Sequence, residues 1–475
     1  MPVKKSNATT PLYYHDATEL AELIRTREVS PVEVTKAHLE RIEAVNPKVN
    51  AITTLLADEA LKAAKEAESA IQKNEEVGPF HGVPFSVKDV IDVAGVRTHG
   101  GSKLLADNIA NVDAPSVARL KKAGGIVLSK TNIPEFALWT ETDNLVTGRT
   151  NNPWDLTRTP GGSSGGESAS IAAGLSPMGV GSDVAISVRG PAALTGIVGL
   201  KPTHGVIPYT GHHPFLRRYW HIGPMARSVR DVASMFDLMR GSDGIDPYSI
   251  YARNPQPAVE RIGGQPVRAG FLSKTGFGPV DPEVAEAVEA SAKLLQQLGY
   301  EVENASIPFL EQNDFVATGM TLFMGELLAD LRKQVVGREA DLHFIGALYA
   351  GLSDPPISDY IAAQAAMTHL KSVFASFFTK YDILLCPVIP FTAPLHQQQE
   401  LVVNGQTIAA TQMMRATVPF NLTGLPGLSV PFRMSSERLP INVQLVSRWF
   451  DEETILRTGA IIESGSTVWE QFPAL

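Results

Sequence analysis

The residues best suited to acyl-transfer chemistry begin with a serine pair in a glycine-rich run. Gly161-Gly162-Ser163-Ser164-Gly165 matches G-x-S-x-G, the pattern of the nucleophile elbow in α/β-hydrolases. That elbow follows an apolar strand, but this run follows Leu156-Thr157-Arg158-Thr159-Pro160, which disfavours the elbow interpretation. The sequence also lacks the Walker A, GxGxxG and HExxH patterns, so kinase, dehydrogenase and zincin functions lose support.

Two other features carry titratable groups. Lys88 lies in an apolar, strand-like run, flanked by Val83, Phe85, Val87 and Val90. Taken alone, such a lysine is usually an exposed strand residue. His212 and His213 are adjacent, but no cysteine or acidic ligand stands at metal-ligand spacing, so they are weak evidence for a metal site.

Three blocks together resemble the signature of the amidase signature family. They are Gly82 to Asp89, Pro160 to Glu167, and Gly181 to Ala192, and their order and spacing also match. Further similar stretches occur at Lys130-Thr131-Asn132, at Gly199 to Thr203, at Gly223 to Arg227 and from Pro419 to Gln444. The resemblance extends from about residue 15 to about residue 460. The aryl acylamidase and urethane-hydrolase branch of the family is the one we expect.

The resemblance implies a Ser-Ser-Lys triad, with Ser187 as nucleophile, Ser163 as bridge and Lys88 as base. A lysine removes a proton only when it is neutral, and burial lowers its pKa towards the working pH. Asp89 would oppose that shift, but consecutive strand residues point to opposite faces. The family pattern also includes a cis peptide bond at the bridging serine, and we expect the preceding Gly162–Ser163 bond to be trans.

The main departure from the family pattern lies before the nucleophile. Family members commonly show Asp-x-Gly-Gly-Ser, whereas this chain has Asp183-Val184-Ala185-Ile186-Ser187. The backbone N–H groups of Val184, Ala185, Ile186 and Ser187 remain available as an oxyanion hole. A β-branched Ile186 takes a positive φ only with strain, so the loop is either conventional or shifted. The side chains of Ala185 and Ile186 would project into space that glycines leave empty, so we expect an altered pocket floor. A catalytically silent binding protein is the alternative.

Other residues are expected to support the triad or the substrate. Asp183 and Arg189 form an ion pair that holds the nucleophile loop, or are solvated charges, and the match to the signature favours the first. Ser164 and Thr159 would supply supporting hydrogen bonds. The segment Phe136 to Thr140, with Leu138, Trp139 and Thr140, resembles the segment that runs along the acyl side of the cleft in family members; the alternative is that Trp139 is a core residue. Residues 205–224, with Tyr209, His212, His213, Phe215, Tyr219 and Trp220, predict an irregular aromatic lid.

The elements that must position these residues alternate between helix and strand. Ser30-Pro31-Val32-Glu33 is a capping box that opens a helix with Val34, Ala37, Ile42 and Val45 on one side. Asp281-Pro282 starts a helix that ends before Gly299, followed by a strand at Tyr300 to Val302. Ser116 to Ala123 predicts a helix and Ile126 to Leu128 a strand. The small residues between Ala169 and Leu175 predict a buried helix rather than a linker. This alternation predicts the α/β class. The resemblance implies a single large domain over residues 1–475, with a mixed twisted sheet flanked by helices and its core signature at about 80–205.

Composition narrows the function further. The 475 residues carry 41 Lys and Arg against 50 Asp and Glu, a net charge of −9, which gives no general attraction to nucleic acid or anionic membrane. The single cysteine, Cys386, excludes an intrachain disulfide and fits a reducing compartment. We expect a cytoplasmic protein with a small-molecule substrate and no cofactor, metal, nucleic-acid or membrane partner; the sequence leaves its oligomeric state open.

The predicted function is therefore that of an amidase, which hydrolyses carbon–nitrogen bonds of linear amides other than peptide bonds. Small aryl amides are the favoured substrates because of the aromatic lid, and carbamates (urethanes) and esters are alternatives for the same triad. A third alternative is the amidotransferase component of a tRNA-dependent complex. The missing glycine pair and the unusual 205–224 segment argue against it.

Overall fold

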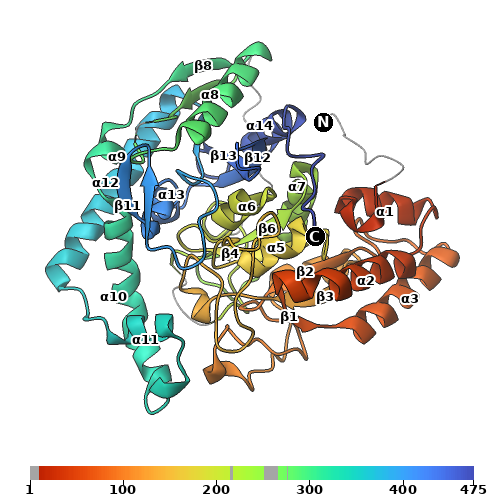
Figure 1. Cartoon of the computed structure of the whole chain (residues 1–475). Coiled ribbons are helices and arrows are strands. Elements are labelled where there is room, and N and C mark those ends of the chain that lie inside the picture. The colour runs from red at the N-terminus through yellow and green to blue at the C-terminus, as the bar shows by residue number, and fades with distance from the viewer. Residues whose placement is uncertain (1–9, 214–217, 251–265, 275) are drawn as a thin grey trace.

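The fold is built on one large mixed sheet, seen in the computed structural model of Figure 1. The structure describes residues 10–213, 218–250, 266–274 and 276–475. Eleven strands lie in the order β1-β3-β2-β4-β6-β5-β12-β13-β9-β7-β8, and β10 and β11 form a separate hairpin. The strands are β1 (Ile52–Leu55), β2 (Pro84–Lys88), β3 (Ile126–Thr131), β4 (Met178–Asp183), β5 (Val198–Lys201), β6 (His221–Ala226), β7 (Arg268–Phe271), β8 (Glu301–Asn304), β9 (Ile383–Pro387), β10 (Glu400–Val403), β11 (Gln406–Ala409), β12 (Gly427–Met434) and β13 (Pro440–Ser447).

Helices cover this sheet along its length. The α-helices are α1 (Ala17–Arg25), α2 (Pro31–Val49), α3 (Ala57–Gln72), α4 (Pro115–Lys122), α5 (Gly165–Ala172), α6 (Arg189–Thr195), α7 (Val229–Met239), α8 (Pro282–Gln297), α9 (Pro308–Gln312), α10 (Phe315–Val335), α11 (Phe344–Gly351), α12 (Ile357–Lys380), α13 (Val418–Thr423) and α14 (Glu452–Ser464). Short 3₁₀ turns lie at Leu12–Tyr14, Lys103–Leu105, Glu135–Ala137, Glu339–Asp341 and Ala410–Met414. In Figure 1, α1 to α3 lie at one side of the molecule and α10 and α11 at the opposite side.

Strand directions confirm the predicted mixed sheet. β2 runs parallel to both β3 and β4, and β7 runs parallel to β8 and β9. The strands between these two groups pair antiparallel, from β4 with β6 through to β13 with β9. The expected α/β class with one large sheet is therefore confirmed.

Local sequence signals account for several elements. Ser30 and Glu33 form both hydrogen bonds of the predicted capping box at the start of α2. Asp281 caps α8, whose first residue is Pro282. The predicted helix at 116–123 and the strands at 126–128 and 300–302 are found as α4, β3 and β8, with bounds shifted by a few residues at most.

The central helix α5 is buried along its whole length, as its small residues predict. Its second residue, Gly166, lies so close to the loop after β3 that a Cβ there would collide with the backbone of Asn132. The glycine-rich sequence therefore lets α5 pack directly on the strands that carry the candidate site. None of the described helices combines the length and apolar character that crossing a bilayer requires.

Candidate active site

Lys88 is the last residue of β2, a strand whose five residues are all buried. Its side chain is fully buried, and Nζ donates hydrogen bonds to Ser163 Oγ at 2.8 Å and to the Ser182 carbonyl at 3.1 Å. The structure thus brings together two of the three residues expected to form the triad.

Burial changes the acid–base behaviour of this lysine. Loss of solvent lowers the pKa of Lys88 to about 7, although the negative charges of Asp183 and Glu167 oppose the shift. Asp89 points away from Lys88, as the alternation along a strand predicts, and its carboxylate lies 3.3 Å from Lys130 Nζ. A substantial neutral fraction of Lys88 is therefore present near neutral pH.

Ser163 lies in a tightly packed loop ahead of α5. The Gly162–Ser163 peptide bond is cis, so the expectation that this bond is trans is wrong, and the cis bond at the bridging serine lies on its N-terminal side. A Cβ on Gly162 would lie 2.8 Å from Thr140 C and 2.9 Å from Glu141 N, so only glycine fits there. Thr159 Oγ accepts from the Gly161 N–H at 3.0 Å, and Ser164 Oγ donates to the Ser182 carbonyl at 3.3 Å. Both residues support the loop as expected.

Ser187 lies in the loop between β4 and α6, and its side chain is 4% exposed. Within the described part of the chain, no hydrogen bond joins Ser187 to Ser163. Such catalytic links are often long in a substrate-free enzyme and tighten when substrate binds. The N–H groups of Val184, Ala185, Ile186 and Ser187 donate to no loop or side-chain acceptor among the described residues. Residues 184–187 also all line one cavity, so these N–H groups stay candidates for the oxyanion hole.

A buried ion pair holds this loop. Arg189 Nε lies 3.0 Å from Asp183 Oδ2, and both side chains are fully buried, so the expected ion pair is confirmed and solvated charges are excluded. Burial would raise the pKa of Asp183, but the Arg189 guanidinium outweighs it and holds that pKa at about 2. Asp183 Oδ2 also accepts the Val188 N–H at 3.1 Å. The carboxylate is thus ionised and fixes the turn that follows Ser187.

Sequence reasoning missed the second layer around Arg189. Its guanidinium also donates to Gln444 Oε1 at 3.0 Å, to the Thr417 carbonyl at 3.1 Å and to Asn421 Oδ1. The only signal for Asn421 and Gln444 was the family-like stretch from Pro419 to Gln444, and Thr417 lies just before it; nothing local ties any of the three to residue 189.

Ser187 opens into a cavity of about 340 Å³, and no charged side chain stands among the described residues that line it. Leu138, Trp139 and Thr140 all line this cavity with Ser187, so the structure places the expected acyl-side segment beside the serine. The residues that sequence reasoning did not find come mainly from α10 and α11 and from the segment before α13: Val316, Met320, Phe323, Met324, Leu348, Tyr349, Leu352, Thr411 and Met414.

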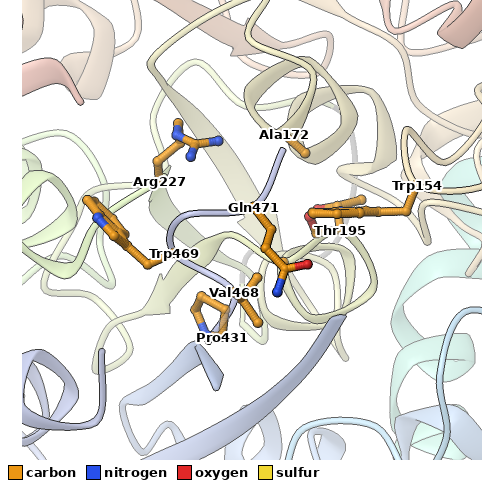
Figure 2. Close-up of a pocket in the computed structure, with 9 residues that line it drawn as sticks. Trp154, Ala172, Thr195, Arg227, Pro431, Val468, Trp469 and Gln471 are labelled. Atoms are coloured by element: carbon orange, nitrogen blue, oxygen red, sulfur yellow. The ribbon is translucent and has the colours of Figure 1, made fainter. Parts of the chain in front are cut away.

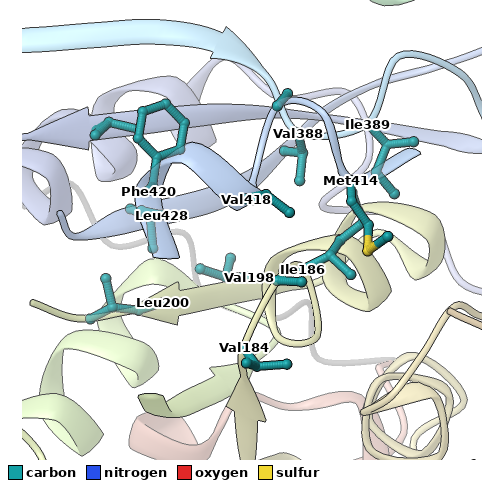
Figure 3. Close-up of a cluster of buried hydrophobic side chains, with 14 of the residues drawn as sticks. Val184, Ile186, Val198, Leu200, Val388, Ile389, Met414, Val418, Phe420 and Leu428 are labelled. Carbon is teal, nitrogen blue, oxygen red and sulfur yellow. The ribbon is translucent and has the colours of Figure 1, made fainter. Parts of the chain in front are cut away.

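Ile186 adopts an ordinary backbone conformation and is not among the residues with positive φ. Its side chain is buried and points towards Met414 and Ile389 in Figure 3, where Val184 lies below it at the end of β4. Val184, Ala185 and Ile186 all line the cavity. These three side chains give this part of the cavity an apolar surface, and the altered pocket floor stays a prediction.

The expected aromatic surface lid over residues 205–224 is corrected by the structure. Tyr209, His212, Tyr219 and Trp220 are buried and do not line the cavity, because their rings pack on one another and on the protein interior. His212 Nε2 lies 2.8 Å from Ser182 Oγ, and the Trp220 ring centroid lies 5.9 Å from Lys88 Nζ. His212 and Trp220 therefore lie beside Lys88 rather than at the cavity. Phe215 lies outside the described residues.

Two other candidate features are separate from this site. His213 pairs with Asp92 at 3.0 Å, and within the described ranges no three His, Cys, Asp or Glu side chains group as metal ligands. A small pocket near the C-terminus is lined by Trp154, Thr195, Arg227 and Trp469 among others (Figure 2), and it contains none of the expected triad.

The comparison with known proteins decides the family. The model of the Amidase family matches residues 33–456. The chain belongs to the amidase family. It is therefore an enzyme of a class that acts on carbon–nitrogen bonds.

Relatives of two kinds are equally similar to this amidase. A glutamyl-tRNA(Gln) amidotransferase subunit of Carboxydothermus hydrogenoformans is 35% identical, over 98% of this chain and 100% of the relative. The acylamidase of Rhodococcus erythropolis is also 35% identical, over 95% and 96%. The solved structure of a bacterial aryl acylamidase of the amidase signature family has a TM-score of 0.86 at 26% identity, over 96% and 97% of the two chains.

Proposed function

We propose that this amidase hydrolyses small uncharged amides, with aryl amides preferred, through an acyl-enzyme on Ser187. The observation that carries this proposal is that Ser187 opens into an apolar cavity, with no charged side chain among its described lining residues, while the fully buried Lys88 contacts Ser163. The similarity to acylamidases supports the same reaction class.

The proposed mechanism moves one proton along the triad. Neutral Lys88 donates a hydrogen bond to the Ser182 carbonyl and uses its lone pair to accept the proton of Ser163, while Ser163 accepts the proton of Ser187. Ser187 Oγ then forms a bond to the amide carbonyl carbon. The oxyanion that results is stabilised by N–H groups of residues 184–187.

Collapse of this intermediate breaks the carbon–nitrogen bond. The proton held by Lys88 returns through Ser163 to the leaving amine, which departs neutral. Water then attacks the acyl-enzyme with the same triad as base, and it releases the carboxylic acid and regenerates Ser187. Carbamates and esters pass through the same tetrahedral oxyanion, so the triad is chemically suited to them as well.

The absence of charged side chains from the described cavity lining favours this class of substrate over a free amino acid that carries its amide in the side chain. Such an amino acid would bring an ammonium and a carboxylate next to lining side chains that offer neither charge a partner, and burying an unpaired charge is costly. An uncharged acyl or aryl group enters this cavity without the free-energy cost of burying an unpaired charge.

A matched pair of anilides tests the proposal. Butyryl 4-nitroanilide and succinyl 4-nitroanilide have the same chain length, but the second ends in a carboxylate. We expect kcat/KM for the butyryl compound to be at least about tenfold higher, because the lining residues provide no cation for the carboxylate. Equal or higher kcat/KM for the succinyl compound would contradict the proposal.

A tRNA-dependent amidotransferase is the second candidate, favoured by the 35% identity to a component of such an enzyme over 98% of this chain. It predicts stable co-purification with partner proteins from the source cells and amide-nitrogen transfer in their presence. This candidate would be ruled out if the chain purifies without partner proteins and hydrolyses anilides as fast without them as with them.

A further inference from the structure

Glu167 occupies a niche built between three strands of the sheet. The residue is on α5 and is fully buried, and its carboxylate accepts hydrogen bonds from Ser86 Oγ on β2 and from Thr131 Oγ on β3, the latter at 2.7 Å. On β4, Gly179 stands beside Ser86 in register, and a Cβ at this position would collide with Glu167 Oε1. Each of the three strands therefore contributes to holding this one carboxylate.

The carboxylate has hydroxyl partners but no cation in direct contact. Among the described residues, no lysine, arginine or histidine forms an ion pair with Glu167. Ser86 and Lys88 stand two residues apart on β2, so both side chains point to the same face of the sheet, towards α5. Lys88 is thus the cation that the Glu167 charge acts upon, through space rather than by contact.

The other groups around Lys88 do not replace this charge. Asp183, at the end of β4, already pairs with Arg189 at 3.0 Å. Burial and the nearby Lys88 lower the pKa of His212 well below its usual value, so this imidazole is uncharged. Trp220 and Ser163 carry no charge. Two carboxylates act on Lys88 in the described structure, those of Asp183 and Glu167. Asp183 forms an ion pair with an arginine, whereas Glu167 does not.

We propose that Glu167 is a positioning residue whose carboxylate sets the protonation of the Lys88 amine. The inference rests on the proposed function, in which neutral Lys88 is the base. A negatively charged Glu167 stabilises the protonated form of Lys88 and raises the pH at which the amine becomes neutral. A neutral Glu167 does not have this effect. Burial raises the pKa of Glu167 to about 7, in the same range as that of Lys88, so the carboxylate changes its charge over the pH range in which Lys88 does.

The test is the pH dependence of Ser187 labelling by a fluorophosphonate, which needs the activated serine but no amide substrate. The variant is Glu167→Gln, because the amide keeps the shape and can still bond both hydroxyls. The acid side of the variant's pH profile of labelling should move to lower pH. At one pH unit below the midpoint of the native protein, the variant should be labelled at least about threefold faster than the native protein. Loss of a merely structural hydrogen bond would lower the plateau and leave the midpoint in place.

Two further variants keep the test decisive. Thr131→Val removes one hydrogen-bond donor to the Glu167 carboxylate and so favours its neutral form. The acid side of the pH profile of labelling should therefore move to lower pH, as for Glu167→Gln. This variant serves as the test if Glu167→Gln does not fold. Glu463→Gln makes the same change at a partly buried glutamate on α14, bonded to the Val229 N–H, and should leave the midpoint unchanged.

The outcomes separate this inference from the proposed function. The inference is overturned, while the triad stands, if native protein is labelled at Ser187 but the acid side of the Glu167→Gln labelling profile stays in place or moves to higher pH. If native protein is not labelled at Ser187, the proposed function fails, and the inference fails with it.

Discussion

The side chain of Ile186 fills space that only a glycine at position 190 leaves open. A Cβ on Gly190 would collide with Cγ1 and Cδ1 of Ile186 and would lie 3.5 Å from Ile389 Cδ1. Two residues that share one turn of the chain are thus matched in volume. This match explains how the loop accommodates an isoleucine where family members commonly have glycine.

The match predicts strong coupling between the two positions. Gly190→Ala should destabilise the fold by about 1–3 kcal/mol through overpacking. Adding Ile186→Ala should recover part of this loss, because the shorter side chain makes room for the new methyl group. A double-mutant cycle from urea unfolding measures the coupling. Strictly additive effects would show that the two side chains do not compete for space.

Asp183→Asn should be among the most damaging single changes outside the triad. It removes the partner of a fully buried guanidinium, which typically costs about 3–5 kcal/mol, and it loosens the turn that follows Ser187. Asp155→Asn is the control, since Asp155 pairs with Arg158 at 3.1 Å and its side chain is 37% exposed. That change should cost less than about 1 kcal/mol in the same unfolding experiment. Similar losses for the two variants would contradict the role of the buried pair.

Activity should depend on pH in the direction that a neutral lysine requires. The pKa of Lys88 is about 7, so the neutral amine is scarce at pH 5 and predominates by pH 8. A profile of kcat/KM between pH 5 and 9 should therefore rise with a midpoint near 7, and fall about tenfold per pH unit well below it. A profile that rises towards acid pH would exclude Lys88 as the base.

Trp139 should determine how tightly apolar acyl groups bind. It lines the cavity with Ser187 and packs edge-on against Phe344 at 6.5 Å between ring centroids. Trp139→Ala should raise KM for butyryl 4-nitroanilide about tenfold, the effect of losing about 1.4 kcal/mol of contact. Trp469→Ala removes the same side chain beside the separate C-terminal pocket and should leave KM unchanged. An equal effect of both changes would argue against Trp139 as a substrate contact.

Local sequence signals were sufficient for part of this molecule. The capping residues of α2 and α8 and the small residues of α5 fix helices through contacts within a few positions. The Lys88–Ser163 contact and the preference for an Asp183–Arg189 ion pair came from the resemblance of three sequence blocks to the amidase signature, and the complete burial of that pair was not predicted.

Outside the stretches that resemble the family, the sequence did not predict contacts between side chains that lie far apart in the chain. The apolar cavity wall comes largely from α10, α11 and Met414, more than 120 residues after Ser187, and no local pattern marks those side chains as neighbours. The aromatic residues of 205–224 were expected at the surface because their density resembled an irregular loop. Those that the structure describes are mostly buried, because Trp220 lies beside Lys88, Tyr209 and His212 pack on Trp220, and Tyr219 packs on Phe323. Lys88 and Phe323 lie far along the chain from this segment, so the sequence alone did not identify them.

The most direct test is release of 4-nitroaniline from 4-nitroacetanilide by native protein, Ser187→Ala and Lys88→Ala side by side. The account predicts release by native protein and its loss in both variants, by at least about a thousandfold, with folding verified by circular dichroism. Release that persists in folded Ser187→Ala would contradict the acyl-enzyme at Ser187. No release by folded native protein would contradict the preference for small aryl amides.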